Sequence, residues 1–374
     1  MSYRPASTLY DVARAAGVST ATVSRVVHGL AGVRPSTRQH VLKVIEQLGY
    51  VPDGAAQSMG RHSKEVIALV TIEGRGPETE IEQEGLLFIE EVLRGVEMVL
   101  SQVGWSVLIS VLREASRPGA YQQLQKVSAK VDGMLISEGI VNSAQLAMLA
   151  ARIPIVLVAG SAAQPHADVI CADNWSGATA LASHLIERHG RRRLYYVAGP
   201  PEAPDALERR RAFEQAVARY PAAILTGCYQ GRFAAISGQL AVREILTLTH
   251  QELPDAIVCC NDQMAIGAMR ELQAAGIRVP ADIAVVGFDD IHLGAMLTPP
   301  LTTVRQSMRL MGERACTLLL ERIADPSAAR KVERLPTELI VRESCGCPPA
   351  RQASVEGGAA VDVEYVAGDE GGFV

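Results

Sequence analysis

The chain has 374 residues, of which 48% are hydrophobic and 21% are charged, and its formal net charge at neutral pH is −5. This length and composition predict a folded, soluble protein of two or three domains. No apolar run reaches the about 18 residues of a membrane span, and the N-terminal sequence MSYRPASTLYDV lacks the apolar centre of a signal peptide, so we expect a cytoplasmic protein with no membrane partner.

Positive charge is concentrated near the N-terminus. Residues 1–64 contain eight Lys or Arg and three Asp or Glu, a net charge of +5, which leaves about −10 for the remainder. A basic segment on an acidic body predicts a polyanion as the partner of that segment.

The N-terminal segment contains the patterns of three short helices. Thr8 and Asp11 have the spacing of a capping box, and Gly17 follows where that first helix would end. Ser19 can cap a second helix, and Pro35 falls in the first turn of a third. Apolar residues at helical spacing are expected to point inward in all three helices. They are Leu9, Val12, Ala13 and Ala16, then Val23, Val26 and Val27, then Val41, Val44, Ile45 and Leu48.

Three short helices around a glycine turn predict a helix-turn-helix unit. The second helix opens with Thr20, Ala21 and Thr22, and Arg25 follows one turn later. Small side chains let a helix approach base edges closely, and an arginine can donate two hydrogen bonds to guanine. This pattern favours DNA reading over the alternative of a small helical subdomain that only packs on the body.

The segments TLYDVARAAGVSTATVSRVVHG and RPSTRQHVLKVIEQLGYVPD resemble the headpiece of the lactose/galactose repressor family of bacterial transcription regulators. The resemblance implies a DNA-binding headpiece over residues 1–49. It implies base reading by Thr20, Ala21 and Arg25, and phosphate contacts by Thr22, Ser24 and Thr37. It also places further residues at the DNA. They are Thr8, Leu9, Ser19, His28, Tyr50, Ala56 and Met59, of which His28 replaces the usual Asn.

In the family a hinge helix follows the headpiece and inserts an apolar wedge into the minor groove. Here residues 50–63 include DGAAQSMGRHSK, with Met59 at the wedge position, where a methionine is acceptable. Asp53 replaces an Asn near phosphate, and Gly54 disfavours the helix. We expect a hinge that is disordered without DNA and weakly helical on it. The alternative is a plain flexible linker.

From residue 64 the pattern changes to apolar strands that alternate with helices, which predicts parallel sheets with helices on both faces. Two such series predict two doubly wound lobes over residues 64–345. Lobe one would take about 64–174 and 305–334, and lobe two about 175–304 and 335–345. Strands are expected at 66–72, 105–112, 132–138, 154–160, 194–199, 222–228, 256–262 and 283–290. Helices are expected near 88–102, 118–130, 143–151, 176–189, 206–219, 237–248 and 263–275.

The body resembles the effector domain of the same family, which is related to periplasmic sugar-binding proteins. The matching segments include DNWSGATALASHLIERHGRRRLYYVAG and CNDQMAIGAMRELQAAGIRVPADIAVVGFDDI. The resemblance implies an effector between the lobes, a sugar first and a nucleoside or other polar metabolite second. It carries the effector-binding role to six residues. They are Ser137, Arg209, Phe233, Asn261, Asp289 and Gln306.

Each of these residues also has a structural interpretation. Asn261 could only cap the helix that follows it, Asp289 could cap a turn, and Arg209 could belong to a solvated helix face. After IPIVLV the chain has Ala159 and Gly160 where many relatives have an Asp, so one polar anchor is missing. The acidic loop at residues 73–87 is a solvated insertion or a lid.

The sequence contains no complete enzyme signature. The strand followed by Gly74 and Gly76 lacks the third glycine of a dinucleotide fingerprint, and Pro77 with four nearby glutamates would disfavour a pyrophosphate. We therefore expect no catalytic residues and no cofactor. The rival interpretations are a solute-binding protein that serves transport and a sugar-modifying enzyme that uses Asp262 and Asp289.

The seven cysteines are an odd number without a CxxC pair, and most lie in apolar runs. We expect neither a disulfide framework nor a zinc site, and His184 and His189 are predicted to be ordinary helix residues. The tail at residues 346–374 is rich in Gly, Ala and Pro and is predicted to be disordered. It has no leucine heptads of the kind that join dimers into tetramers, so we expect a homodimer that binds a pseudo-palindromic operator. The resemblance implies a repressor of a carbohydrate-uptake or catabolic operon.

Overall fold

The computed structural model describes residues 7–27, 30–50, 63–73, 86–113, 117–137, 139–248 and 253–348. The predictions for His28, for Ala56 and Met59 in the hinge, for the acidic loop between residues 74 and 85, and for the tail beyond residue 348 lie outside the described residues. Within the described ranges, no helix combines the length and the apolar character needed to cross a membrane.

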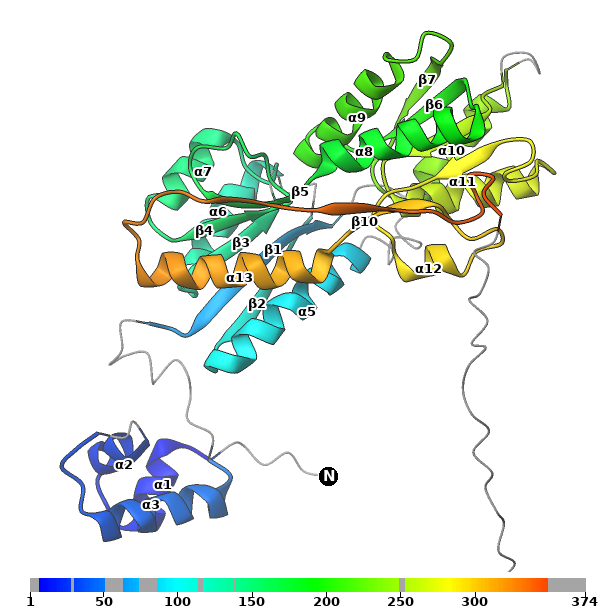
Figure 1. The fold of residues 1–374 in the computed structure, drawn as a ribbon. Helices are drawn as coiled ribbons and strands as arrows, with labels where there is room; N and C mark the ends of the chain where they lie inside the picture. Colours follow the sequence, from blue (N-terminus) through cyan, green and yellow to red (C-terminus); the bar gives the residue numbers. More distant parts are fainter. Residues whose placement is uncertain are drawn as a thin grey trace, which may run out of the picture.

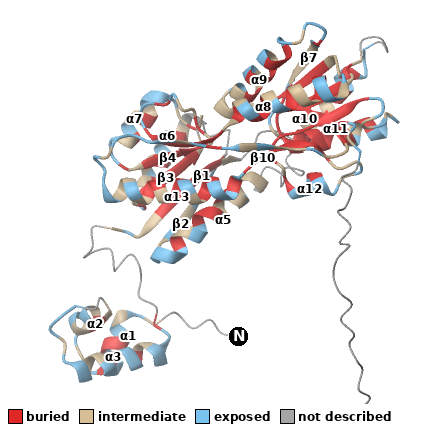
Figure 2. Ribbon diagram, viewed as in Figure 1, coloured by how far each residue is buried: buried red, intermediate tan, exposed pale blue. Residues whose placement is uncertain are grey.

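The head contains three helices, α1 (Leu9–Ala16), α2 (Thr20–Val27) and α3 (Pro35–Leu48). The capping box is confirmed, because the Asp11 backbone N–H donates to the Thr8 hydroxyl and the Asp11 carboxylate accepts from the Thr8 backbone N–H. The apolar positions of the three helices meet in one small core (Figures 1 and 2). Its fully buried members include Val12, Val23 and Val41.

Leu48 does not point inward as predicted. It is the last residue of α3 and is 37% exposed. The chain then turns at Gly49, whose φ of 58° is left-handed, and Tyr50 folds back into the head core instead. The helical period placed Leu48 inward, but the helix ends there and the residue after the glycine turn fills the core position.

Lobe one is a six-stranded, all-parallel sheet in the order β11-β5-β4-β3-β1-β2 (Figure 1). Its strands are β1 (Val66–Glu73), β2 (Ser106–Arg113), β3 (Gly133–Ser137), β4 (Ile155–Val158), β5 (Asp168–Ala172) and β11 (Val332–Leu335). Its helices are α5 (Leu86–Val103), α6 (Arg117–Ser128), α7 (Ser143–Ala150) and α13 (Met308–Ala324). Alternate residues of β1 face opposite ways: Ile67 packs with α5 and α13, and Ala68 packs with α6 and α7. Burial on both faces explains why these strands read as continuous apolar runs.

Lobe two is a four-stranded, all-parallel sheet in the order β7-β6-β8-β9. Its strands are β6 (Arg193–Ala198), β7 (Ile224–Gln230), β8 (Ala256–Cys259) and β9 (Ala284–Val286). Its helices are α8 (Asn174–Ser183), the π-helical turn η3 (His184–Arg188), α9 (Pro204–Val217), α10 (Ala235–Ile245), α11 (Asp262–Ala274) and the short α12 (His292–Ala295). The predicted fold class, a helical head on a body of two parallel-sheet lobes, is confirmed.

Three chain segments pass between the lobes, and they are fastened to one another. The strands β10 (Thr303–Gln306) and β12 (Thr337–Ile340) form an antiparallel pair, shown across the middle of the body in Figure 1. The third crossing, at Asp173, accepts a hydrogen bond from the Thr337 hydroxyl at 2.9 Å and donates its own N–H to the Leu335 carbonyl at 2.7 Å. The three crossings are therefore held together by hydrogen bonds.

Candidate functional site

The exposed face of α2 presents the side chains predicted to read bases. Ala21 and Arg25 lie four residues apart and are both exposed, so they share a face, while Val23 and Val26 are buried on the opposite side. Thr20, Thr22 and Ser24 are half-buried. The Ser19 hydroxyl accepts the Thr22 backbone N–H at 3.2 Å and so starts the helix.

The other head residues that the sequence assigns to DNA are less uniformly placed. Thr8 is exposed, but its hydroxyl donates to Asp11 at 2.6 Å, and Leu9 and Thr37 are half-buried. Tyr50 is only 8% exposed and packs in the head core. Arg38, which the sequence analysis did not select, donates to the Leu30 carbonyl at 2.6 Å and thereby braces the loop between α2 and α3.

In the body, Arg209 is the centre of a buried polar cluster. Arg209 lies on α9 and is only 2% exposed, which excludes the interpretation that it belongs to a solvated helix face. Its Nε donates to Asn174 Oδ1 at 2.8 Å, and its Nη1 donates to the Cys260 carbonyl at 2.8 Å. The guanidinium also stacks on Phe288, 3.8 Å from the ring centroid.

Two carboxylates and an amide complete the surroundings of Arg209. Asp289 Oδ1 lies 3.4 Å from Arg209 Nη1 and accepts from Gln306 Nε2 at 2.5 Å, and Asp205 Oδ2 lies 3.5 Å from Arg209 Nη2. Burial raises the pKa of Asp289 to about 6, although the positive charge of Arg209 opposes that shift. Asp205 was not selected from the sequence, but it stands one helical turn before Arg209, a spacing that could have identified it.

Asn261 combines both interpretations offered by the sequence. It caps α11, because its Oδ1 accepts the Met264 N–H at 3.0 Å, and its Nδ2 donates to the Phe233 carbonyl at 2.9 Å. Phe233 has a left-handed φ of 68°. A side chain at Gly199 would lie 2.6 Å from the Phe233 ring, so the glycine leaves room for that ring at the end of β6.

Asp262 is the functional candidate that sequence reasoning mostly missed. It is fully buried, its Oδ1 accepts from the Thr303 hydroxyl at 2.5 Å, and its Oδ2 accepts from the Ile291 N–H at 2.9 Å. Burial, and then the negative charge of Asp289, raises its pKa to about 7. The sequence signal was the acid that directly follows Asn261 at the end of β8.

Apart from Glu65, which precedes β1, the described non-glycine residues with left-handed backbone lie just beyond the carboxyl ends of strands. Besides Phe233, they include Ala159 after β4 and Asp289 and Asp290 after β9, with φ of 55°, 126° and 58°. Such conformations cost free energy and persist where the surrounding structure holds them, commonly at ligand sites. These ends are also where ligands of open α/β sheets bind.

Ser137 ends β3 and therefore belongs to lobe one, and Gln306 ends the inter-lobe crossing β10, whereas the other four predicted effector residues belong to lobe two. The loop after Ser137 meets lobe two, since a side chain at Gly139 would lie 2.9 Å from the Glu202 carbonyl oxygen. The carboxyl ends of β3 and β6 thus face each other across the lobes.

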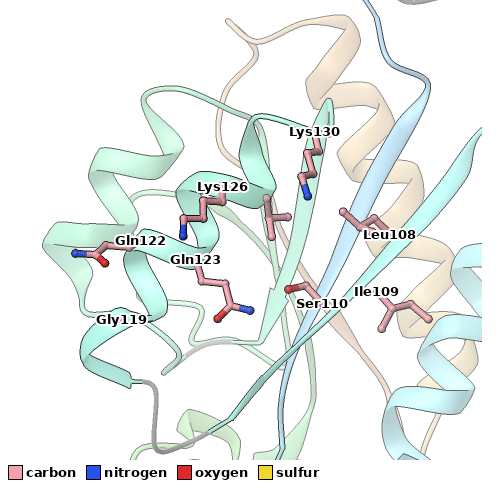
Figure 3. A pocket seen from close by; sticks show the side chains of 9 residues that line it. Leu108, Ile109, Ser110, Gly119, Gln122, Gln123, Lys126 and Lys130 are labelled. Atoms are coloured by element: carbon pink, nitrogen blue, oxygen red, sulfur yellow. The ribbon is translucent and has the colours of Figure 1, made fainter. Parts of the chain in front are cut away.

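A groove of about 520 Å³ lies elsewhere, between β2 and α6 (Figure 3). Its lining includes Leu108, Ser110, Gln123, Lys126 and Lys130. None of the residues predicted to bind effector lines it, so it is separate from the Arg209 cluster.

The prediction that His184 and His189 are ordinary helix residues needs correction. Both lie at the π-helical turn η3, and the structure brings them together with Cys345 and Cys347. The sequence did not indicate this cluster, because the two cysteines are about 160 residues away and are spaced CxC.

Comparison with known proteins decides the family. Residues 8–53 match the family described as bacterial regulatory proteins, lacI family, and residues 182–345 match the periplasmic binding protein-like domain. The HTH-type transcriptional repressor PurR of Aliivibrio fischeri is 31% identical over 345 residues, which cover 90% of this chain and 98% of the relative. The chain belongs to the lacI family of bacterial regulatory proteins.

Other relatives and solved structures agree with this membership. PurR of Mannheimia succiniciproducens is also 31% identical, over 90% of this chain and 98% of its own length. The lac repressor dimer bound to operator and the anti-inducer ONPF is 28% identical, with a TM-score of 0.78, and the match covers 91% of this chain and 99% of that one. The complex of the transcriptional regulator CelR with cellobiose is 31% identical, with a TM-score of 0.66 and coverage of 91% and 100%.

This lacI-family regulator is a DNA-binding transcriptional repressor and not an enzyme. The catalytic use of Asp262 and Asp289 that the sequence left open is thereby set aside, and so is a solute-binding protein that serves transport.

Proposed function

We propose that two copies of this regulator bind a pseudo-palindromic operator through α2, and that a small polar effector bound at the Arg209 cluster sets the operator affinity. The observation that carries the proposal is the buried Arg209 guanidinium, held between Asn174, Asp289 and the ring of Phe288 at the strand ends. A buried arginine fork with neighbouring carboxylate and amide groups suits a ligand rich in hydroxyls or ring nitrogens.

The DNA part rests on the exposed pair Ala21 and Arg25 and on the net positive charge of residues 1–64. Arg25 would read a guanine, and the hydroxyls of Thr22, Ser24 and Thr37 would contact phosphates. Residues of the hinge, Ala56 and Met59, would enter the minor groove, as the family resemblance implies.

A sugar is the first candidate for the effector. Asp289 and Gln306 belong to the Arg209 cluster, and Asn261 directly follows Cys260, whose carbonyl accepts from Arg209. Their acceptors and donors would match several hydroxyl groups, and the half-buried Phe233 ring could stack on a sugar face. The CelR–cellobiose complex, which is 31% identical, supports this class.

A purine is the second candidate. The named relatives at 31% identity are PurR repressors, and the Phe233 ring could stack on a planar base. In that case Asp289 would accept from a ring N–H and Arg209 would donate to a carbonyl or ring nitrogen.

A homodimer is supported by exposed apolar side chains on adjacent elements of lobe one. Met98 and Val103 on α5 are 48% and 51% exposed, and Ile109 and Val111 on the edge strand β2 are 47% and 46% exposed. Apolar groups gathered at a sheet edge favour association with a second copy.

The effector class can be tested by fluorescence anisotropy on an operator selected from a random duplex pool. Purified protein would be titrated with cellobiose and with monosaccharides, and in parallel with hypoxanthine and guanine. We expect one class to change operator affinity by about 5-fold to 150-fold, which corresponds to a coupling of about 1–3 kcal/mol. If neither the sugars nor the purine bases change the operator affinity or raise the melting temperature of the protein, the proposed effector role of the Arg209 cluster is wrong.

A further inference from the structure

We propose that His184, His189, Cys345 and Cys347 form a closed Cys2His2 site for zinc in lobe two. All four potential ligand atoms lie within 4.8 Å of one another. The site would fasten the last part of the body to the segment that leads into β6. This inference is independent of the effector proposed above.

The distances agree with a tetrahedral metal site. His184 Nε2 and His189 Nε2 are 3.2 Å apart. Cys347 Sγ lies 3.3 Å from His189 Nε2 and 3.8 Å from His184 Nε2, and Cys345 Sγ lies 3.3 Å from His184 Nε2. Tetrahedral zinc with Zn–N and Zn–S bonds of ordinary length separates two nitrogens by about 3.3 Å and a nitrogen from a sulfur by about 3.6 Å.

The backbone explains how His184 and His189 converge. In an α-helix, residues five apart point about 140° away from each other. Here the helix after α8 widens into the π-helical turn His184–Arg188, whose i to i+5 spacing brings residues five apart onto one side. Such turns are frequently found at functional sites, and this one has no role in the Arg209 cluster.

The two cysteines converge through the glycine between them. Gly346 has a φ of 110°, and a side chain there would lie 3.2 Å from His189 Nδ1. Glycine therefore permits both the backbone turn and the close approach to His189. The same segment is anchored to the lobe-two sheet, since the Ser344 hydroxyl donates to the Val285 carbonyl at 2.6 Å.

The surroundings suit a bound zinc ion. Cys345 is fully buried, and the Thr302 hydroxyl lies 3.2 Å from its sulfur as a donor that would orient a thiolate. Two thiolates would balance the charge of the cation, and zinc binding would release the thiol protons.

The four ligand atoms of the cluster indicate both which metal it would bind and what role that metal would have. Two thiolates and two imidazoles select zinc rather than magnesium or calcium, which prefer oxygen ligands. Four protein ligands leave no open position, so the role is structural. The histidines also precede β6, whereas the Arg209 cluster lies beyond its far end, so the zinc would not contact an effector.

The test is the metal content of full-length, tag-free protein expressed with added zinc and dialysed against metal-free buffer. Mass spectrometry of the metal is expected to give about one zinc per chain for the wild type and none for the double variant Cys345→Ser, Cys347→Ser. The matched control is the double variant Cys171→Ser, Cys228→Ser, which alters cysteines outside the cluster and should keep its zinc.

Two further measurements keep the test decisive if the cysteine variant does not fold. The wild type refolded with Co²⁺ should show the strong visible bands of a tetrahedral site and a thiolate-to-metal charge-transfer band, and His189→Gln should weaken both. Two results would overturn the proposal. One is wild-type protein that retains no more zinc than the cluster variant. The other is a thiol count, after lysis without reducing agent, that shows a Cys345–Cys347 disulfide.

Discussion

The guanidinium carbon of Arg209 lies 3.8 Å from the centroid of the Phe288 ring. This contact covers one face of the guanidinium, while Asn174 and the Cys260 carbonyl hold two of its nitrogens in plane. The side chain is therefore positioned before any effector arrives, which reduces the entropy lost on binding.

Replacing Arg209 with Lys should abolish most of the effector response. Lysine cannot form the planar fork, and the loss of about one charge-assisted hydrogen bond would weaken effector binding by roughly 10-fold to 150-fold. Isothermal titration calorimetry with the effector identified by the anisotropy screen measures this change. Arg210→Lys is the control, because Arg210 is 38% exposed and pairs with Glu214 instead. Equal affinities in Arg209→Lys and wild type would contradict the assignment.

Replacing Arg25 with Ala should relax operator specificity. Loss of a bidentate contact to guanine costs about 1–3 kcal/mol at one position of each half-site, while phosphate contacts persist. Competition between the selected operator and the same duplex with that base pair exchanged measures the loss. Arg14→Ala removes another exposed head arginine, one that pairs with Asp11, and it should leave the preference intact. A preference that survives Arg25→Ala would show that another residue reads the base.

The contribution of Asp262 and Asp289 to stability should fall as pH rises from about 4 to about 7. The ordinary pKa of an aspartate is 3.8, whereas burial raises that of Asp262 to about 7 and that of Asp289 to about 6. Between these values the folded state holds protons that the unfolded chain has lost, so the free energy of unfolding decreases with increasing pH. Denaturant unfolding at several pH values measures the slope, and Asp262→Asn should make it shallower. An unchanged slope in that variant would exclude Asp262 as its source.

A charge on the exposed apolar surface of lobe one should separate the dimer. Met98→Glu places a carboxylate among Val103, Ile109 and Val111, and loss of an interface contact of about 2 kcal/mol would raise the dimer dissociation constant by roughly 30-fold. Sedimentation at graded concentrations measures the constant. Met148→Glu is the control, because Met148 is 52% exposed on α7 in another part of lobe one. If both variants dimerise equally, the interface lies elsewhere.

The sequence predicted the regular parts of this fold because those parts have a clear period. The eight expected strands and the helices between them all form, and the capping of α1 follows from Thr8 and Asp11 alone. The strands β5, β10, β11 and β12 and the helix α13 were not predicted. The strands β10, β11 and β12 are short and mix charged with apolar residues, as in VERL and TELI. Their pairing depends on partners far along the chain, which no local pattern reports.

Some residues of the candidate sites could likewise be predicted from the sequence, and others could not. Arg209, Asn261 and Asp289 stand in motifs that the sequence could identify, and their meeting at the strand ends follows from the parallel sheet. The burial of Asp262, the contact of Asp205 with Arg209 and the meeting of His184 with Cys345 depend on side-chain packing. The π-helical turn adds a further difficulty, since an α-helical period places His184 and His189 on different faces.

The fastening of the three inter-lobe crossings limits how the lobes can move. Because Asp173 is bonded to Leu335 and Thr337, and β10 is paired with β12, the crossings cannot slide past one another without breaking hydrogen bonds. The motion that leaves these bonds intact is a twist about the bundle of crossings. If the effector binds at the Arg209 cluster as proposed, it contacts Gln306 and Asp289 beside these crossings. We then expect effector binding to rotate one lobe relative to the other and so to change the orientation of two copies in a dimer.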